Sequence, residues 1–264
     1  MNENKYPTEV EAAFLVVSDK PRDILDRIAK LSSLGRYDLR SGKTKIIRDR
    51  YFDTPEHFLQ DLKLALRIRE ADGMRLIALK GPSRSVPGGG VERLEIEEEW
   101  SIDAFRKVLK VLKSMNIEIV SLKDAVGSKD PIVALSRYNF GIVQERETER
   151  VVKNVVHKIG DNRHVVAEMA IDMVKYLFSD IGSIVRIYEI EIEKKGDGSP
   201  FIMMELADEL MGNFESEIRK WNYGKLATGN AIKQLLKEFT QPDIVDDEGN
   251  LGLKAFDLIE NYLR

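Results

Sequence analysis

The sequence predicts an α+β protein in which an antiparallel β-sheet packs against a few helices. Short segments with alternating apolar and polar residues recur along most of the 264 residues. Between them lie stretches whose apolar residues recur every three or four positions, the spacing of an amphipathic helix. A third observation is that charged residues occupy every second position of many strands. It predicts that the sheet closes on itself around a charged interior.

Eight segments have the period-two pattern of a strand. They are TEVEAAFLVV (8–17), KTKIIRDRYF (43–52), LKLALRIRE (62–70), MRLIALKG (74–81), VERLEIEEEW (91–100), NFGIVQERETERVV (139–152), HVVAEMAIDMV (164–174) and SIVRIYEIEIE (183–193). Side chains alternate across a strand, so each segment has one more apolar face and one more polar face. This number of strands predicts a mostly antiparallel sheet.

Helices are expected over residues 18–31, 103–115 and 200–211. The first has an N-cap signal at Ser18 or Asp19 and Pro21 in its first turn. The apolar stripes of these helices are expected to pack outside the sheet. The segment KAFDLIENYLR (254–264) predicts one more helix, so we expect a domain over residues 1–240 and a C-terminal helical appendage over 241–264.

Composition narrows the function. The net charge of −4 argues against nucleic acid or an anionic membrane as a main partner. The chain has no cysteine and only three histidines without metal-ligand spacing, which disfavours thiolate sites, a histidine-built zinc site and a Ser-His-Asp triad. Near the N-terminus the apolar run Ala12 to Val17 is too short for a signal sequence or a membrane span. We expect a cytoplasmic protein.

Charged residues repeat on single strand faces. In YEIEIE (188–193) the three glutamates share one face, and such faces recur on other strands. The residues are Glu9 and Glu11; Arg67 and Arg69; Arg93, Glu95 and Glu97; Gln144, Arg146 and Arg150; Glu168 and Asp172; Glu189 and Glu191; and Lys80. One such strand alone is usually a solvated face. Six together are explained by an eight-stranded antiparallel β-barrel, closed on itself around a charged interior.

A charged interior requires bound partners of both signs, because buried charges are tolerated only when they are paired or ligated. Carboxylates are hard oxygen ligands that suit Mg²⁺ or Mn²⁺. Arginine and lysine suit phosphate oxygens, and arginine can bind them bidentately. The pattern therefore predicts a metal-bound polyphosphate ester as the ligand.

The motifs also resemble a known family, the CYTH superfamily of triphosphate tunnel metalloenzymes. The similarity covers about residues 8–230 and rests on nine short motifs in order. They are E-V-E (9–11), YFDTP (51–55), LRIR (66–69), LKGP (79–82), RLEIE (93–97), QERETER (144–150), AEMAID (167–172), YEIEIE (188–193) and GKLATG (224–229). The resemblance implies an open tunnel formed by an eight-stranded barrel, with helices outside.

The resemblance also implies roles for individual residues. The expected ligands of one or two divalent ions are Glu9, Glu11, Asp172, Glu189 and Glu191, of which Glu9 and Glu11 are also the candidate catalytic residues. The expected phosphate ligands are Arg67, Arg69, Lys80, Arg93, Arg146 and Lys225. Glu95 and Glu97 are either further metal ligands or partners of neighbouring arginines. Arg150 and Glu193 are expected near a barrel mouth, in solvent.

One position departs from the family pattern. The signature E-x-E-x-K reads Glu9-Val10-Glu11-Ala12-Ala13, with alanine in place of lysine. The leading hypothesis is a divalent-metal-dependent hydrolase of tripolyphosphate or of a nucleoside or thiamine triphosphate. The alternatives are a module that binds triphosphate or polyphosphate without turnover, which Ala13 favours, and a class IV-type adenylyl cyclase.

Overall fold

The computed structural model describes residues 8–85, 91–117, 119, 128–196, 200–240 and 244–264. For residues 8, 9, 83–85, 91–94 and 200 it describes the backbone alone.

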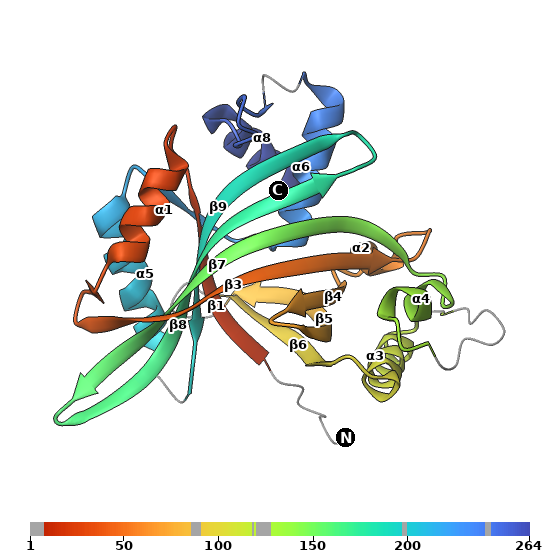
Figure 1. Ribbon diagram of the computed structural model, residues 1–264, viewed down its shortest axis with the longest axis horizontal. Helices are drawn as coiled ribbons and strands as arrows, with labels where there is room; N and C mark the ends of the chain where they lie inside the picture. The colour runs from red at the N-terminus through yellow and green to blue at the C-terminus, as the bar shows by residue number, and fades with distance from the viewer. Residues whose placement is uncertain (1–7, 86–90, 118, 120–127, 197–199, 241–243) are drawn as a thin grey trace. The chain divides into compact units, whose positions relative to one another are not determined.

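The described chain is an α+β protein with a large antiparallel sheet (Figure 1), as the sequence predicts. Its strands are β1 (Thr8–Val16), β2 (Ser33–Leu34), β3 (Tyr37–Asp53), β4 (Ala65–Ala71), β5 (Met74–Ser85), β6 (Val91–Glu99), β7 (Gly141–Ile159), β8 (Asn162–Phe178), β9 (Ser183–Lys194) and β10 (Ile218–Trp221). Its helices are α1 (Pro21–Lys30), α2 (Phe58–Asp61), α3 (Ile102–Ser114), α4 (Pro131–Ser136), α5 (Pro200–Phe214), α6 (Lys225–Glu238) and α8 (Leu253–Leu263). All eight segments with the period-two pattern are strands.

The chain divides into two compact units. The first includes Ile47–Ser83 and Arg93–Arg146, and the second includes Glu9–Ile46, Arg84–Glu92 and Glu147–Arg264. The strands β3 and β7 each contribute residues to both units.

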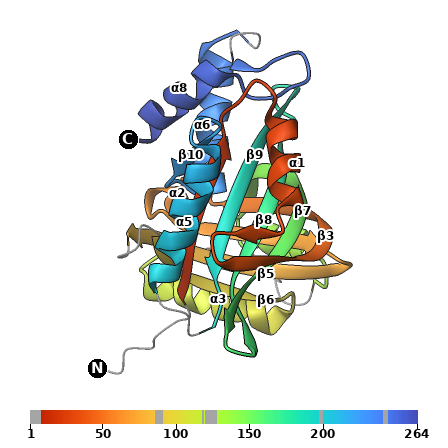
Figure 2. The same ribbon diagram turned by 90° about the vertical axis from the view of Figure 1, so that its left-hand side faces the viewer.

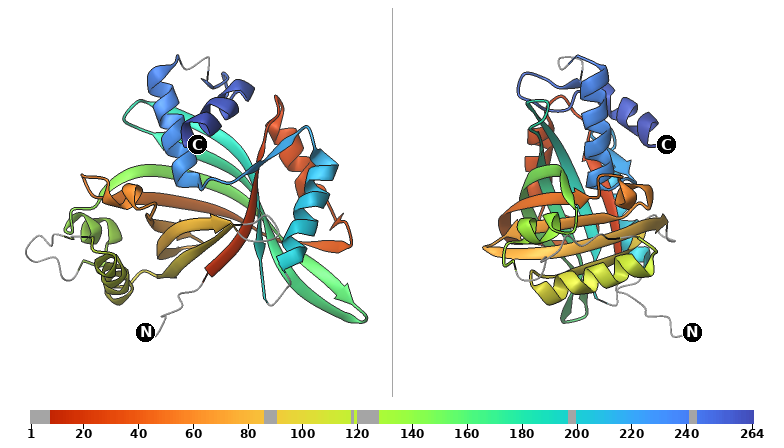
Figure 3. Two further views of the ribbon diagram at one scale, coloured as in Figure 1. Left: turned by 180° about the vertical axis from the view of Figure 1, so that it is seen from behind. Right: turned by 90° about the vertical axis from the view of Figure 1, so that its right-hand side faces the viewer.

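In the first unit, β4 pairs antiparallel with β3 and with β5. This register places Arg69 opposite Asp49, and strand alternation places Arg67 on the same face as Arg69. The opposite face of β4 and β5 is apolar and packs against α3 (Figure 3). Ser101 caps α3 by accepting a hydrogen bond from the backbone N–H of Ala104 at 3.0 Å. The main residues of this core are Leu66, Ile68, Ile77, Leu79, Phe105, Val108 and Leu112.

In the second unit, β9 pairs antiparallel with β8 and with β1. Glu189 therefore lies opposite Asp172 of β8, while Glu191 lies between Ala170 of β8 and Ala13 of β1. The intervening residues of β9 face the other side of the sheet, where α1 and α5 cover them (Figure 2). These buried residues are Tyr188, Ile190 and Ile192. The acidic residues of YEIEIE are thus on the face away from this apolar core.

The helices α6 and α8 pack against each other (Figure 3). Their apolar residues belong to a buried cluster at one end of the acidic face. Leu15 and Val174 lie two residues beyond Ala13 and Asp172, on the same strand faces. They are fully buried in a cluster with residues of α6 and α8, including Ile232, Leu235, Phe256 and Ile259. The charged face of these strands therefore ends where the two helices begin to cover it.

Two features of the fold differ from expectation. The closed eight-stranded barrel is not confirmed, because the described sheet has ten strands and its closure stays a prediction. The additional strands, β2 and β10, have two and four residues, too few for a period-two signal. The helices expected from the sequence are α1, α3, α5 and α8, whereas α2, α4 and α6 were missed. None of the helices in the described residues is both long enough and apolar enough to cross a membrane.

Candidate functional site

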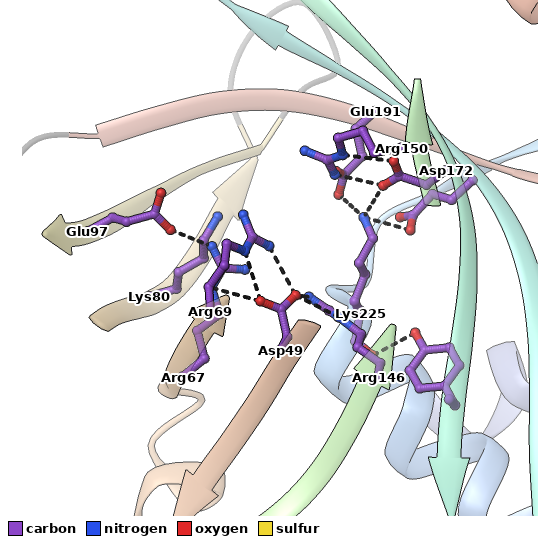
Figure 4. A network of polar contacts seen from close by, with 12 residues as sticks. Asp49, Arg67, Arg69, Lys80, Glu97, Arg146, Arg150, Asp172, Glu191 and Lys225 are labelled. Carbon is purple, nitrogen blue, oxygen red and sulfur yellow. Dashed lines mark hydrogen bonds and ion pairs between the residues drawn. The ribbon is translucent and has the colours of Figure 1, made fainter. Parts of the chain in front are cut away.

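Three arginines of the first unit converge on one buried aspartate (Figure 4). The carboxylate of Asp49 accepts hydrogen bonds from Arg69 Nε at 2.8 Å and Nη2 at 3.1 Å. It also accepts from Arg146 Nε at 3.1 Å and Nη2 at 2.7 Å. Arg67 Nε lies 4.0 Å away, beyond hydrogen-bond distance. We call Asp49, Arg67, Arg69 and Arg146 the arginine cluster.

The arginine cluster is buried and strongly charged. The exposed fractions of the side chains are 1% for Asp49, 2% for Arg146, 5% for Arg67 and 15% for Arg69. Burial by itself would raise the pKa of Asp49, but Arg146, Arg69 and Arg67 outweigh it and hold that pKa well below its usual value. Asp49 is therefore ionised at neutral pH, with three guanidinium groups around one carboxylate.

Two glutamates and a lysine extend the arginine cluster. Glu97 accepts a hydrogen bond from Arg67 Nη2 at 2.8 Å, and Glu95 lies 3.0 Å from Lys80 and 3.8 Å from Arg67. Burial would raise the pKa of Glu97, but Arg67 and Arg69 hold it below the usual value. The sequence left Glu95 and Glu97 as either metal ligands or partners of neighbouring arginines. In the structure both lie beside cationic side chains.

Arg67 has a buried donor that the described residues do not satisfy. Its Nε has no hydrogen-bond partner among them, although it lies in the interior of the cluster. A buried unsatisfied donor costs free energy unless a ligand or water accepts from it. Phosphate oxygens match this requirement, because guanidinium groups bind them through paired N–H donors.

A second group of charged residues lies in the second unit (Figure 4). It consists of Arg150 on β7, Asp172 on β8, Glu189 and Glu191 on β9, and Lys225 at the start of α6. We call these five residues the carboxylate cluster. Its residues come from three adjacent strands and one helix, and the register of β8 and β9 brings the carboxylates together.

Arg150 and Lys225 hold the three carboxylates in different ways. Arg150 donates to Asp172 Oδ1 at 2.8 Å, to Asp172 Oδ2 at 2.7 Å and to Glu191 Oε2 at 2.7 Å. The Nζ of Lys225 lies 2.7 Å from Glu189 Oε2 and 3.5 Å from Asp172 Oδ2, and it also contacts Glu191 Oε1. The guanidinium makes directed hydrogen bonds, whereas the ammonium acts as a shared point charge.

Burial and the neighbouring charges together shift the pKa values of this cluster. Burial raises the pKa of Glu189 to about 7, opposed by Lys225 and reinforced by Glu191 and Asp172. Burial would lower the pKa of Lys225, but the surrounding carboxylates outweigh it and raise that pKa. Arg150 behaves in the same way, and its pKa is also raised. Both cations therefore stay charged, while Glu189 changes its protonation state near neutral pH.

Local bonds fix the backbone that carries Lys225. α6 begins at Lys225 after Gly224, whose carbonyl accepts from Thr228 N at 3.0 Å. Tyr176 donates its hydroxyl proton to the carbonyl oxygen of Lys225 at 2.9 Å, and Trp221 Nε1 donates to Thr228 Oγ1 at 2.9 Å. The GKLATG motif is thus a helix start anchored to β8 and β10.

The remaining expected site residues are placed as follows. Glu11 is 7% exposed and pairs in register with Glu193. The side chains of Glu9 and Arg93 lie outside the described ones, although their backbones belong to β1 and β6. Ala13 is 9% exposed and lies opposite Glu191.

The carboxylate cluster has the donor chemistry of a divalent-metal site. Three carboxylates within one buried group are the hard oxygen ligands that Mg²⁺ and Mn²⁺ prefer. Within the described residues, however, no three acidic or histidine side chains are arranged so that they could hold an ion, and Lys225 and Arg150 lie on the carboxylate oxygens instead. The donor atoms of these residues suit a divalent ion, and in this structure the ammonium of Lys225 contacts them.

Two residues of these clusters were missed or misplaced from the sequence. Asp49 was not identified, because it stands between Arg48 and Arg50 in a strand that looks solvated. Arg150 was expected in solvent, but its side chain is 16% exposed and hydrogen-bonded to two carboxylates. The predicted strand ended at residue 152, whereas β7 continues to Ile159, so Arg150 lies in the strand interior.

Asp53, the aspartate of the YFDTP motif, has a structural role. Asp53 is 4% exposed and accepts hydrogen bonds from the backbone N–H groups of Thr54 and Leu59 at 2.8 and 2.9 Å, and from that of Gln60 at 3.0 Å. It therefore caps the turn and the short helix α2 that follow β3.

Comparison with known proteins gives a family and related folds. The family model of the CYTH domain matches residues 9–213. A solved structure of an adenylyl cyclase candidate from Hippeastrum, described as having a dominant triphosphatase activity, has 18% sequence identity and a TM-score of 0.52 over 84% of this chain and 95% of that chain. A candidate adenylate cyclase from Bacillus halodurans has 20% identity and a TM-score of 0.44, over 83% and 96%. The triphosphatase of the Mimivirus capping enzyme has 11% identity and a TM-score of 0.34, over 80% and 90%. No curated protein matches the chain.

Proposed function

Because the chain belongs to the CYTH domain family, we propose that it is a divalent-metal-dependent hydrolase of triphosphate-containing compounds. The observation that carries the proposal is the separation of buried charge into two kinds of cluster. One surrounds a single carboxylate with three guanidinium groups, and the other gathers three carboxylates around one ammonium and one guanidinium. These are the chemistries of a phosphate site and of a metal site.

The arginine cluster would bind and orient phosphate groups. Arg69 is its most exposed arginine, and Arg67 has a buried Nε without a partner among the described residues. Fixed guanidinium donors stabilise the charge that develops on phosphate oxygens during transfer. Lys80 on β5 and Arg93 on β6 are proposed as further phosphate ligands. Lys225 on α6 is also a proposed phosphate ligand.

The carboxylate cluster would hold Mg²⁺ or Mn²⁺ through Asp172, Glu189 and Glu191, with Glu9 and Glu11 as further proposed ligands and as the candidate catalytic residues. A bound divalent ion would neutralise phosphate charge and lower the pKa of an attacking water. Arg150 keeps Asp172 and Glu191 in place through three hydrogen bonds. These bonds fix the orientation of two proposed ligands.

A binding module without turnover is the second candidate. It is favoured by Ala13, which stands where the family signature has lysine and lies opposite Glu191. Without that lysine, the chain lacks one cation beside the proposed metal ligands.

Phosphate release from tripolyphosphate, ATP and thiamine triphosphate, with and without Mg²⁺ or Mn²⁺, tests the proposal. We expect metal-dependent release that Glu191→Gln lowers strongly, while the exposed Glu215→Gln leaves it unchanged. Tight tripolyphosphate binding without release would support the binding module. Formation of cyclic AMP from ATP would instead support the cyclase hypothesis, and absence of both binding and release would contradict the proposal.

A further inference from the structure

We infer that Lys225 competes with the divalent ion for the carboxylates that we propose as its ligands. The metal-free protein would then bind the ion weakly until the ammonium moves away. The inference rests on the proposed function and adds a control on metal binding that is built into α6.

The contacts of Lys225 are with the proposed metal ligands themselves. Its Nζ lies 2.7 Å from Glu189 Oε2, contacts Glu191 Oε1 and lies 3.5 Å from Asp172 Oδ2. A Mg²⁺ ion needs oxygen ligands at about 2.0–2.1 Å and tolerates little departure from octahedral geometry. An ion bound to Glu189 and Glu191 would therefore occupy the same space as the ammonium.

The ammonium is less firmly fixed than the guanidinium beside it. The Nζ of Lys225 and the Oε2 of Glu189 are buried, and neither has a hydrogen-bond partner among the described residues, so the contact between them is an ion pair. Arg150, in contrast, makes three hydrogen bonds within the same cluster. Of the two cations, Lys225 is the one that fewer directed bonds retain.

The backbone around Lys225 is anchored, so the exchange requires only side-chain movement. The carbonyl of Lys225 accepts from Tyr176, and the first turn of α6 is held by Gly224 and Thr228. A lysine side chain has four methylene groups that rotate about single bonds, and its ammonium does not depend on one binding geometry. The charge can therefore leave while the helix stays in place.

Charge balance favours the exchange. With Lys225 in place, three carboxylates face two cations. Replacing the ammonium by a divalent ion would neutralise these carboxylates, with Arg150 remaining. A divalent ion and the ammonium of Lys225 together would place two positive charges close to each other in a buried site, which is unfavourable. A phosphate group, for which Lys225 is also a proposed ligand, would favour the departure of the ammonium.

The test is calorimetric titration of the 264-residue protein with Mn²⁺ in the absence of any phosphate compound. Lys225→Met and Lys225→Gln are expected to bind Mn²⁺ about tenfold more tightly than wild type, because removal of a nearby positive charge favours a second cation. Lys220→Met, which removes an exposed lysine of β10, is the control for net charge and should bind like wild type.

The outcomes separate the inference from the function on which it rests. If both folded Lys225 variants bind Mn²⁺ no more tightly than wild type, the inference that Lys225 competes with the ion is wrong. The assignment of the carboxylates as metal ligands would still stand. The same gain in Lys220→Met would also overturn it, since net charge would then explain the effect. No Mn²⁺ binding by any of the proteins would overturn the proposed metal site and the inference together. If a variant is less stable, the rise of its melting temperature on adding Mn²⁺ gives the same comparison, because a ligand of the folded state stabilises it.

Discussion

Asp49 and Arg146 are joined by two hydrogen bonds, of 3.1 and 2.7 Å, and neither side chain is more than 2% exposed. Asp49 makes a second pair of hydrogen bonds with Arg69. The guanidinium groups would repel one another in the absence of this carboxylate. The orientation of the proposed phosphate ligands therefore depends on an aspartate that need not touch the ligand.

Asp49→Asn should lower the free energy of unfolding at pH 7 by about 3–5 kcal/mol, because it leaves buried guanidinium groups without their charged partner. The pKa of Asp49 is lowered in the folded state, so its contribution is fully present above the usual value of 3.8 and decreases as pH falls below it. Denaturant unfolding of both proteins at several pH values measures the difference.

The control for this prediction is Asp103→Asn, in which the side chain is 82% exposed and paired with Arg106 on the surface of α3. We expect a change within about 0.5 kcal/mol. Equal stability of Asp49→Asn and wild type at pH 7 would contradict the role assigned to Asp49.

Arg69→Lys should weaken tripolyphosphate binding about tenfold, because lysine keeps the charge but loses the paired donors of the guanidinium. Arg69→Ala should weaken it further. Calorimetric titration with tripolyphosphate is the measurement, and Arg106→Lys, on the surface of α3, is the matched control. Unchanged affinity in both Arg69 variants would mean that the phosphate ligands lie elsewhere.

Glu189→Gln should become more stable relative to wild type as pH rises. Its pKa is raised from 4.5 to about 7 on folding, so the stabilisation from the bound proton is fully present below about 4.5 and is lost as pH rises through 7. Glutamine resembles the protonated form at every pH. The free energy of unfolding of the variant minus that of wild type should rise by about 2–3 kcal/mol between pH 4.5 and pH 8.

Unfolding measured at intervals between pH 4.5 and pH 8 in metal-free buffer checks this prediction. The exposed Glu215→Gln should show no such trend. A stability difference between Glu189→Gln and wild type that does not vary with pH would show that Glu189 is already ionised at the low end of the range.

Asp53→Ala should destabilise the protein by about 2 kcal/mol without changing tripolyphosphate affinity. The substitution removes the acceptor of three backbone N–H groups around α2, and the usual cost of losing a capping side chain is about 0.5–2 kcal/mol. Thermal unfolding and calorimetry report the two quantities separately. Asp61→Ala, an exposed residue at the end of α2, is the control. A loss of affinity at unchanged stability would place Asp53 in the ligand site instead.

The sequence predicted the strands better than the clusters. Alternation identified β9, because Ile190 and Ile192 are buried in the core while Glu189 and Glu191 face the other side. The same alternation does not reveal which strands pair, so the contact between Asp49 and Arg69 became visible only with the register. The α6 helix was missed because Gly229 weakens its helical signal.

The metal ligands and phosphate ligands that the sequence predicted remain predictions, because the charged side chains pair with one another in the structure. The sequence assigned the carboxylates to a metal and Lys225 to phosphate, but the structure pairs Lys225 with three of those carboxylates. Opposite charges on neighbouring elements neutralise one another when no ligand is bound, and no pattern along one strand can show this. Lys225, the first residue of α6, contacts Glu191 although the two residues are 34 positions apart in the sequence.

Ala13→Lys tests the departure from the family signature. Ala13 lies opposite Glu191, so a lysine there would place a cation beside the carboxylate that already binds Arg150 and Lys225. If the missing lysine acts as a general base, its return should raise phosphate release about 10²- to 10⁴-fold. If it acts only as a phosphate ligand, the gain should be small and should be seen mainly as tighter tripolyphosphate binding.

We expect wild type to be a slow, metal-dependent triphosphatase and Ala13→Lys to be faster. Ala13→Met is the matched control, because it introduces a side chain of similar length without charge at a site that is 9% exposed. A gain in both variants would indicate an effect of packing, since methionine cannot accept a proton or bind phosphate. Efficient turnover by wild type, with no gain in Ala13→Lys, would show that position 13 does not limit the reaction, and that the bound metal and the remaining cations are sufficient for it.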